Sequence, residues 1–585
     1  MAANQRLDPA GRPEACRVNK FIATCFFVAF WDLSAPVARA QQAPAKRLQL
    51  QTAEKLYADQ KWDEVVRLTS EQSGQPTEFL YLRGMALMRL NRWQEAREAF
   101  TSGIEKTPQD TRFLVERAGA EYRLKDFPAA KSDLRAALRT QPKDQYTLDF
   151  LGTIYLLEGN SEAALKYWNN EEKPRLARVT LSPKPQLKDE LISRALAFNA
   201  PQVLELGTFR TTEARLANLG VFPQVRLELK PVGESEYEAV LHLNERGGWE
   251  YSRWTGAISL LSGVPYQTVY PEWYNIGHRA VNFASMVRWD SQKRRAHASL
   301  TVPIGHEADR VVEIFVDGRD ENWNLSQTFS GSAAPITDLN LRRIEAGIEL
   351  RSVVNGNWSW TAGSGVIGRS FRNGDVTASV GGSPFFISST SLEAWAGVKR
   401  AIWRVPERRF TVTGSLESRF GRGFKDNLGP FGSTGGSIRA DWLPHAKGEA
   451  DAFHSNVRGS NLFGRVPLDQ LFELGLDRDS ELWLRGHSAT TDGRKGRAPL
   501  GRRYVLINSD YDRQLYNGGF FRVLAGPFVD MGKITDDTAA FGDPRWLVDT
   551  GVQVKLRVLG SVAVVLSYGR DLRNGRGTFF GTTER

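Results

Sequence analysis

The sequence predicts a multidomain protein: an all-helical repeat region, a small α+β domain and a C-terminal antiparallel transmembrane β-barrel of about 16 strands. Residues 48–172 repeat with a period of 34. From residue 247 to the end, apolar and polar residues alternate, as they do in strands with one wet face. No apolar window of about 18 residues exists, so spanning helices are not expected, whereas barrel strands escape such a search. The boundaries are placed at 1–40, 41–174, 175–246 and 247–585.

Residues 1–40 are expected to be a signal peptide. Arg17 and Lys20 supply a positive start, and residues 21–30 supply a short apolar core. Ala38-Arg39-Ala40 has the small-x-small form that a signal peptidase cleaves. A disordered tail with a chance apolar run is the alternative. Export would place the mature chain in the bacterial envelope.

Composition and charge argue against several classes of chemistry. Both cysteines, Cys16 and Cys25, lie in the expected signal peptide, so the mature chain would carry no thiol. The seven histidines lie far apart in the sequence, and neither a metal nor another cofactor is expected. The net charge of +10 is compatible with nucleic-acid binding, but the arginines are dispersed over alternating strand positions. A barrel lumen or an anionic lipid surface explains them better, so nucleic acid is not an expected partner.

The repeats are defined by columns of residues that share the 34-residue step. The columns are Gly84, Ala118 and Gly152; Trp93, Phe127 and Ser161; Ala96, Ala130 and Ala164; and Phe100, Leu134 and Trp168. Small residues at close contacts with large ones between them resemble the tetratricopeptide repeat, in which paired antiparallel helices stack on their neighbours. The resemblance implies a concave surface that binds other envelope proteins. A plain spacer is the alternative.

Residues 175–246 are predicted to form a strand, two helices and two further strands. These elements are expected at residues 178–181, 187–198, 211–219, 225–229 and 237–243. Gly220-Val221-Phe222 forms a Leu-Gly-Val-Phe step with the preceding leucine. The order of elements and this step resemble a POTRA domain. The resemblance implies a module that receives unfolded client strands by edge pairing, and a structural linker is the alternative.

The C-terminal region alternates over many strands, for example at residues 343–351, 410–417 and 552–558. A soluble β-sandwich also has one polar face, so alternation alone does not decide. A barrel is favoured because no helical period could cover a second layer, aromatic residues lie near the expected strand ends, and an export signal precedes the chain. Spanning strands need roughly 9–11 residues, so about 340 residues accommodate about 16 strands. A lumen of that width is aqueous and needs a plug.

Four motifs near the C-terminus carry a more specific resemblance. They are Leu484-Arg485-Gly486-His487, Asn508-Ser509-Asp510-Tyr511, Phe528-Val529-Asp530-Met531-Gly532 and Leu566-Ser567-Tyr568-Gly569. Their order and separation resemble the outer-membrane assembly and surface-antigen superfamily, which includes BAM-type insertases and two-partner secretion transporters. The resemblance covers residues 175–585. It implies that the loop around Arg485 is a lumen plug.

An arginine fork can hold such a loop by a bidentate bond to a carboxylate. Because the neighbours of Asp530 in its strand would face outward, Asp530 would face the lumen, and we expect Arg485 to pair with it. Two departures from the superfamily pattern stand out. His487 replaces an aromatic residue, which would alter the packing of the plug. The sequence ends Thr-Thr-Glu-Arg, so the usual C-terminal aromatic signal is missing or shifted to Phe579-Phe580.

The sequence carries no recognisable enzyme signature. Gly363 to Gly368 fits the dinucleotide fingerprint as a string, but no helix is expected after it. No nucleophile elbow, Walker loop or histidine pair at metal-ligand spacing is present. We therefore expect a protein that is not an enzyme.

These expectations combine into one function. The barrel would lie in outer-membrane lipid with its N-terminal domains in the periplasm, where it would assemble or translocate unfolded or exported polypeptides. An exopolysaccharide export porin with a tetratricopeptide scaffold is the runner-up. Such a porin would lack the Leu-Gly-Val-Phe step and would line its lumen with an acidic or aromatic sugar track. A structural anchor for other envelope proteins is the third alternative.

Overall fold

The computed structural model describes residues 35–70, 76–233, 236–250, 252–304, 308–325, 336–372, 385–424, 429–445, 450–537, 541–558 and 562–584. The chain divides into two compact units, Met1–Asp126 and Phe127–Arg585. Most of the expected signal peptide lies outside the described residues, and the first helix, α1, begins at Ala35. None of the described helices is both long enough and apolar enough to cross a membrane.

The first unit is built of antiparallel helices. They are α1 (Ala35–Ala58), α2 (Trp62–Ser70), α3 (Thr77–Arg89), α4 (Trp93–Lys106) and α5 (Thr111–Arg123). A Cβ atom on Gly84 of α3 would lie 2.3 Å from the ring of Phe100 of α4, so the two helices can approach this closely only because residue 84 is glycine. The rings of Phe100 and Phe113 are fully buried, with their centroids 6.4 Å apart. The small-residue and aromatic columns of the repeat are therefore partners in helix packing.

The second unit begins with the same construction. Its first helices are α6 (Phe127–Thr140), α7 (Gln145–Leu157) and α8 (Ser161–Trp168), followed by the short turn η1 (Asn169–Glu171). A Cβ atom on Gly152 would lie 2.5 Å from the indole of Trp168, so this glycine and this ring repeat the contact between Gly84 and Phe100. The Trp168 ring also lies 5.2 Å, centroid to centroid, from the ring of Tyr237. The last helix pair thus packs directly on the small sheet that follows.

That sheet belongs to a small α+β domain. Its elements are β1 (Arg175–Ser182), α9 (Asp189–Ala195), α10 (Leu206–Asn218), β2 (Val225–Pro231) and β3 (Glu236–Leu243). The strand order is β1-β3-β2, with β1 parallel and β2 antiparallel to β3. The elements follow the predicted order, although α10 begins at Leu206 and not at residue 211. Gly207 in its first turn lowers helix propensity and hides this start in the sequence.

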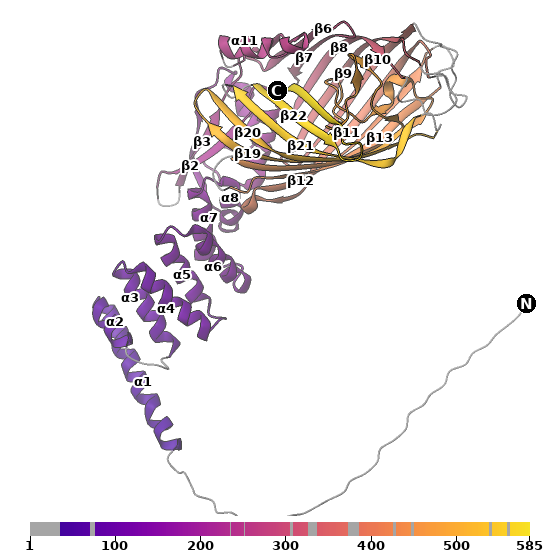
Figure 1. The fold of residues 1–585 in the computed structure, drawn as a ribbon. Coiled ribbons are helices and arrows are strands. Elements are labelled where there is room, and N and C mark those ends of the chain that lie inside the picture. Colours follow the sequence, from indigo (N-terminus) through magenta and orange to yellow (C-terminus); the bar gives the residue numbers. More distant parts are fainter. Residues whose placement is uncertain are drawn as a thin grey trace, which may run out of the picture. The chain divides into compact units, whose positions relative to one another are not determined.

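Most of the remaining strands close into a barrel, in which successive long strands pair antiparallel with one another (Figure 1). The strands are β4 (Thr268–Val269), β5 (Glu272–Ile276), β6 (Val281–Trp289), β7 (Lys293–Pro303), β8 (Arg310–Trp323), β9 (Leu339–Asn355), β10 (Trp358–Arg372), β11 (Ser389–Val405), β12 (Phe410–Gly423), β13 (Phe431–Trp442), β14 (Asp451–Gly464), β19 (Arg503–Asn517), β20 (Phe521–Thr535), β21 (Gly542–Val558), β22 (Val562–Asp571) and β23 (Gly577–Glu584). The predicted fold class is confirmed. The glycine-rich string from Gly363 to Gly368 lies within β10, as a strand and not as a nucleotide-binding turn.

Alternation along the strands sorts side chains between the two faces of the barrel. On β9, Ile344 and Ile348 are 64% and 47% exposed, whereas Glu345 between them is 6% exposed. Glu345 accepts a hydrogen bond from Arg343 at 2.5 Å on the inner face. The outer face is therefore apolar, and the inner face carries paired charges.

The barrel region does not begin with a strand. The helix α11 (Arg253–Leu261) and the turn η2 (Val264–Tyr266) precede β4. The helix starts with a capping box in which the Ser252 hydroxyl accepts from the Thr255 N–H, and the Thr255 hydroxyl accepts from the Ser252 N–H. This reciprocal cap satisfies two backbone donors and favours a helix where alternation had predicted strands from residue 247.

Candidate functional site

The connection between β14 and β19, residues 465–502, lies inside the barrel. It contains η4 (Leu468–Gln470), β15 (Phe472–Glu473), β16 (Thr490–Thr491), β17 (Arg494–Lys495) and β18 (Leu500–Gly501). Ion pairs join it to β10 through Asp469, to β7 through Asp477 and to β20 through Arg485. Strands so far apart around the ring can be reached together only from the interior. We call residues 465–502 the luminal loop.

Arg485 holds the luminal loop to β20. Its Nε and Nη2 atoms donate to the two carboxylate oxygens of Asp530 at 2.8 and 2.6 Å, and its backbone N–H donates to the same carboxylate at 3.0 Å. Its Nη1 donates to Asp510 and, at 3.1 Å, to Gln553. The guanidinium carbon lies 3.7 Å from the centroid of the Phe528 ring. Arg485 thus meets the residue that the sequence predicted, and a forked bond of this kind fixes orientation as well as position.

Gly486 brings the backbone of the loop directly against the barrel wall. Its N–H donates to the Asp549 carboxylate of β21 at 2.6 Å. A Cβ atom here would lie 2.6 Å from the backbone nitrogen of Asp571 and 2.7 Å from the Asp549 carboxylate. The wall is equally close at Gly569, where a Cβ atom would lie 2.1 Å from the carbonyl oxygen of Arg485. Glycine is required on both sides of this contact.

Gly532, the last residue of the predicted strand motif, lies beneath two leucines of the loop. A Cβ atom here would lie 3.1 Å from Leu474 and 3.2 Å from Leu484. The two leucines belong to a buried apolar cluster with Leu506, Ile534 and Leu547. This cluster excludes water next to the Arg485 pair, and ionic attraction is stronger where water is absent.

His487 bridges two carboxylates of the wall. Its Nδ1 lies 3.0 Å from Asp549 and its Nε2 lies 3.5 Å from Asp571. Burial by itself disfavours the charged ring, but the hydrogen bond and charge of Asp549, together with the charge of Asp571, raise the pKa of His487 above its ordinary value. The sequence predicted altered packing at this position. The alteration is a change from ring packing to an ionic bridge.

Within the part of the chain that the structure describes, His487, Asp549 and Asp571 are also grouped closely enough to hold a metal ion. Their potential ligand atoms lie within 4.8 Å of one another. Imidazole and carboxylates are suitable ligands for a divalent cation. Each ring nitrogen, however, faces its own carboxylate, and a protonated imidazole has a donor for each. The arrangement therefore favours a charged histidine over a metal centre.

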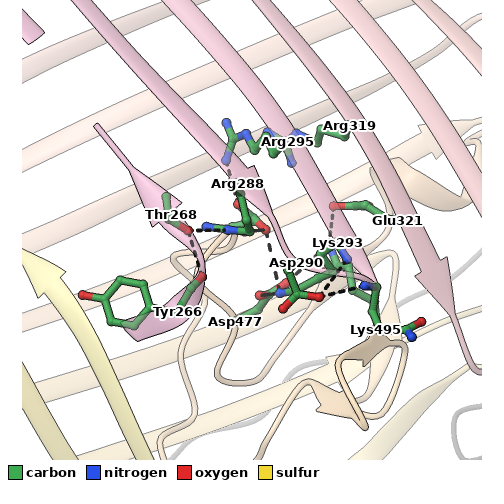
Figure 2. Close-up of polar contacts among 12 residues, drawn as sticks. Tyr266, Thr268, Arg288, Asp290, Lys293, Arg295, Arg319, Glu321, Asp477 and Lys495 are labelled. Carbon is green, nitrogen blue, oxygen red and sulfur yellow. Dashed lines mark hydrogen bonds and ion pairs between the residues drawn. The ribbon is translucent and has the colours of Figure 1, made fainter. Parts of the chain in front are cut away.

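A second set of contacts holds the loop to β6 and β7 (Figure 2). Asp479 pairs with Arg288 at 2.5 Å and with Arg295 at 2.8 Å, and Asp477 pairs with Lys293. The side chains of both aspartates are 1% exposed, so these ion pairs are shielded from water. The polarity is opposite to that of the first contact: here the loop supplies anions and the wall supplies cations.

Lys495 of β17 extends this ionic group. Its Nζ lies 3.6 Å from Glu321, 3.6 Å from Asp477 and 3.9 Å from Glu473. It also lies 4.8 Å from the centroid of the Trp323 ring. Figure 2 shows Lys495 in one ionic group with Asp477 and Glu321. Two separate parts of the luminal loop are thereby tied to each other as well as to the wall.

Arg369 of β10 makes the third contact. Its Nε lies 2.8 Å from each carboxylate oxygen of Asp469, and its Nη2 donates to Glu393 of β11 at 2.7 Å. The Arg369 side chain is fully buried. Sequence reasoning missed the second and third contacts, because the partners lie 184 and 100 residues apart. The run Asp477-Arg478-Asp479 in an otherwise basic loop was the one local signal that could have indicated them.

The predicted repeat residues lie in the helical cores. Buried positions are Ala96, Ala118, Ala130, Gly152 and Ala164. Trp93 and Phe127 are half-buried and begin α4 and α6. The guanidinium of Arg123 lies 5.4 Å from the centroid of the Trp93 ring. These residues hold helices together and leave the exposed faces to other side chains.

The step Gly220-Val221-Phe222 is a joint between the small domain and the barrel. Val221 and Phe222 are 0% and 1% exposed, and Gly220 has a φ of +73°, which glycine adopts freely. The Asn282 side chain of β6 donates to the carbonyl oxygen of Leu219 at 2.9 Å. A Cβ atom on Gly220 would lie 3.0 Å from that same amide. The step therefore ends α10 and seats it on the start of β6.

Helices α8 and α10 also rest on the turn η3 (Pro406–Arg408) and the end of β11. Lys166 pairs with Glu407 at 2.5 Å. Glu162 accepts hydrogen bonds from Arg210 at 2.9 Å and from Arg404 at 3.1 Å. Near these groups, burial and the charge of Glu162 raise the pKa of Glu213 to about 7, against the opposing charges of Arg404 and Arg210. The joint thus contains a carboxyl group that titrates near neutral pH.

Comparison with known proteins identifies the repeats and finds similar barrels. Residues 81–145 match the tetratricopeptide repeat family, as the 34-residue period predicted. None of the curated proteins matches this chain. One similar solved structure is BamA from Haemophilus ducreyi lacking POTRA domains 1–3, which is 13% identical over 70% of this chain and 84% of that chain, with a TM-score of 0.40.

Two further similar structures are CdiB proteins. CdiB from Acinetobacter baumannii is 13% identical, with 72% of this chain and 80% of that chain covered and a TM-score of 0.44. CdiB from Escherichia coli is 13% identical, with 70% and 76% covered and a TM-score of 0.45. The solved structures to which this chain is similar thus include BamA and CdiB proteins.

Proposed function

We propose that this protein is an outer-membrane β-barrel that assembles or translocates polypeptides, with its N-terminal domains in the periplasm. The outer surface of the barrel supports the membrane location. Leu416 is 65% exposed and Ile438 is 54% exposed on neighbouring strands, although both are apolar. A closed barrel satisfies its backbone hydrogen bonds between strands, as a lipid environment requires. An apolar outer face over an ionic interior suits contact with hydrocarbon.

The observation that carries the proposal is the luminal loop. Buried ion pairs hold it on three sides of the lumen, through Asp469, Asp479 and Arg485. A pore for freely diffusing solutes needs a permanent aqueous path. A loop whose release breaks several buried ion pairs is instead an obstacle that yields only to a specific event. Arrival of a polypeptide client is such an event.

The small domain supports a role in receiving extended chains. Its strand order leaves β1 and β2 at the two edges of the sheet. An extended polypeptide can add to such an edge through backbone hydrogen bonds. The tetratricopeptide repeats would bind client or partner proteins. Strand pairing and burial of client apolar surface would supply the free energy, and the proposal requires neither an enzymatic activity nor a cofactor.

An exopolysaccharide export porin remains the main competitor. Its lumen would carry an acidic or aromatic track for sugars, whereas many of the charges that line this lumen are paired with the luminal loop or with one another. A scaffold for envelope proteins would need the repeats but not the luminal contacts. The proposal is therefore favoured over both by the same observation, the anchored loop.

Depletion of the protein in its native host tests the proposal. We expect depletion to lower the amount of folded outer-membrane barrels or of exported polypeptides, while surface polysaccharide stays unchanged. Complementation with Arg503→Ala, an exposed arginine paired with Asp537, should restore the phenotype, whereas Arg485→Ala should not. Loss of polysaccharide with an unchanged envelope proteome would overturn the proposal in favour of the porin.

Photo-crosslinking then identifies the cargo at the edge of the small sheet. A crosslinking residue at the exposed Arg226 of β2 should capture unfolded barrel or exported polypeptides, and the same residue at Glu190 of α9 should not. Phe222 is unsuited to this purpose, because its side chain is buried. Capture of folded envelope proteins alone at both positions would support the scaffold.

A further inference from the structure

The barrel closes between its last strand, β23, and its first, β4. Few backbone hydrogen bonds can form at this junction, because β4 is only two residues long and is separated from β5 by Tyr270 and Pro271. Other neighbouring strands pair over long stretches; β9 and β10, for example, pair from Asn355 and Trp358 to Asn340 and Arg372. Side chains must therefore supply much of the attraction at this junction, which we call the seam.

Arg478 of the luminal loop contacts both sides of the seam. Its Nη2 donates to the carbonyl oxygen of Gly581 of β23 at 3.0 Å. Its guanidinium carbon lies 4.4 Å from the centroid of the Tyr266 ring, at the end of the turn η2 before β4, and 5.0 Å from the centroid of the Phe580 ring of β23. The hydroxyls of Tyr266 and Thr583 are themselves hydrogen bonded across the seam. One cation is thus held between an aromatic ring from each edge.

The residues next to Arg478 secure the two edges separately. On the β4 side, Asp479 pairs with Arg288, whose Nε donates to the Thr268 hydroxyl at 3.1 Å. Figure 2 shows Arg288 between Thr268 and the loop, with Tyr266 beyond Thr268.

On the β23 side, the Trp483 ring packs edge-on against Phe580 at 5.9 Å between centroids. The Trp483 indole N–H donates to the carbonyl oxygen of Asp477 at 3.0 Å, which fixes the turn itself. The start of β23 is also bonded to the loop, because the Thr578 hydroxyl donates to the carbonyl oxygen of Gly486 at 2.9 Å.

We propose that residues 477–483 of the luminal loop form a clasp that holds the barrel seam closed, with Arg478 as the residue that joins the two edges. The clasp makes withdrawal of the loop and opening of the seam a single event, because Arg478, which bridges β23 and the turn before β4, lies between Asp477 and Asp479, which anchor the loop to the wall. The argument concerns the barrel alone and does not depend on what the barrel transports.

Hydrogen exchange on the purified full-length protein in detergent, without any client, tests the clasp. In Arg478→Ala we expect the amides of residues 264–269 and 577–584 to exchange at least tenfold faster than in the wild type, with β9 and β10 unchanged. Arg494→Ala is the matched control: it removes an arginine from the same loop, where the guanidinium donates to the carbonyl oxygen of Thr337 away from the seam. This control should leave exchange at the seam as in the wild type.

Unchanged exchange at the seam in Arg478→Ala, or an equal increase in Arg494→Ala, would overturn the proposal. If Arg478→Ala does not yield a folded barrel, Arg478→Lys decides in the same measurement. Lysine keeps the charge but lacks the planar fork that stacks between Tyr266 and Phe580, so we expect a smaller increase confined to the seam. A failure here would leave the depletion phenotype untouched, and the two proposals can therefore fail independently.

Discussion

Arg485 and Asp530 are joined by three hydrogen bonds, two from the guanidinium and one from the backbone N–H, and the Asp530 side chain is fully buried. Removing one partner of a buried pair leaves the other charge uncompensated, at a cost of about 3–5 kcal/mol. The luminal loop should consequently be the part of the barrel that responds first to substitution at this pair.

We expect Arg485→Ala to release the luminal loop from β20 and to raise single-channel conductance in planar lipid bilayers severalfold. Arg485→Lys should have an intermediate effect, because lysine keeps the charge but cannot make the forked bond. Arg503→Ala, which removes an exposed arginine, should conduct like the wild type. Equal conductance in all four proteins would show that the loop does not obstruct the lumen.

Gly486→Ala should weaken docking of the loop without changing any charge. The added methyl group would meet the Asp571 nitrogen at 2.6 Å and the Asp549 carboxylate at 2.7 Å, so the loop backbone must move away from the wall. We expect a lower thermal unfolding temperature, measured by loss of the heat-modifiable band on gels. Gly519→Ala is the control, since nothing lies within 4 Å of its Cβ position. A thermal midpoint as high as that of the control would contradict the tight contact.

The bridge from His487 should make docking of the loop depend on pH. The pKa of His487 is raised in the folded protein, after the opposing effect of burial, by the hydrogen bond and charge of Asp549 and by the charge of Asp571. Asp543 acts in the same direction. The stabilising contribution of charged His487 is therefore complete below its unfolded pKa of about 6.5, and it is lost as the pH rises through the higher pKa of the folded protein.

Conductance measured between pH 5 and pH 9 checks this dependence. We expect the wild type to become more conductive as the pH rises above about 6.5, whereas His487→Gln should lose that dependence. His445→Gln, at an exposed histidine paired with Asp451, should behave like the wild type. If the conductance of His487→Gln still depends on pH, a group other than His487 causes that dependence.

The joint between the small domain and the barrel should respond to pH in its own way. Burial first, and then the charge of Glu162, raise the pKa of Glu213 to about 7, so the protonated form is favoured in the folded joint. Because the unfolded group ionises near pH 4.5, the joint should weaken as the pH rises from about 4.5 through 7. Glu213→Gln should remove this weakening.

Protection of the α10 amides against hydrogen exchange, compared between variant and wild type at pH 5 and pH 8, measures the effect. We expect Glu213→Gln to exceed the wild type in protection at pH 8 and to match it at pH 5. Glu190→Gln, at an exposed residue of α9, should equal the wild type at both values. No difference at pH 8 would mean that Glu213 does not control the joint.

Features with a local or periodic signal could be predicted from the sequence. The 34-residue step follows from helix pairs in which Gly84 and Gly152 admit the rings of Phe100 and Trp168. The alternation of apolar and polar residues follows from a barrel wall whose outer face is apolar and whose inner face carries charges. The pairing of Arg485 with Asp530 could be predicted, because the order of the motifs put the Arg485 guanidinium in a lumen loop and the Asp530 carboxylate on the lumen face of a nearby strand.

Features that depend on closure of the ring could not be predicted. Asp477 and Lys293 lie 184 residues apart, and the acidic run around Asp477 does not indicate which basic residue of the wall it meets. The helix α11 was missed although its cap, Ser252 with Thr255, is a local signal, because the alternation of the barrel strands was predicted to begin at residue 247. The role of His487 depends on Asp549 and Asp571, which reach it from two strands that the sequence could only place approximately.

The opposite polarity of the loop contacts has a consequence for the barrel wall itself. Arg288, Lys293 and Arg369 face the loop on one side, whereas Asp510, Asp530 and Asp549 face it on the other. Withdrawal of the loop would leave Arg288 and Lys293 without their loop aspartates. On the other side of the bore, Asp530 and Asp549 would lose Arg485 and His487, so uncompensated cations would face uncompensated anions. A passage polarised in this way suits a cargo that carries both charges along its length, as polypeptides do.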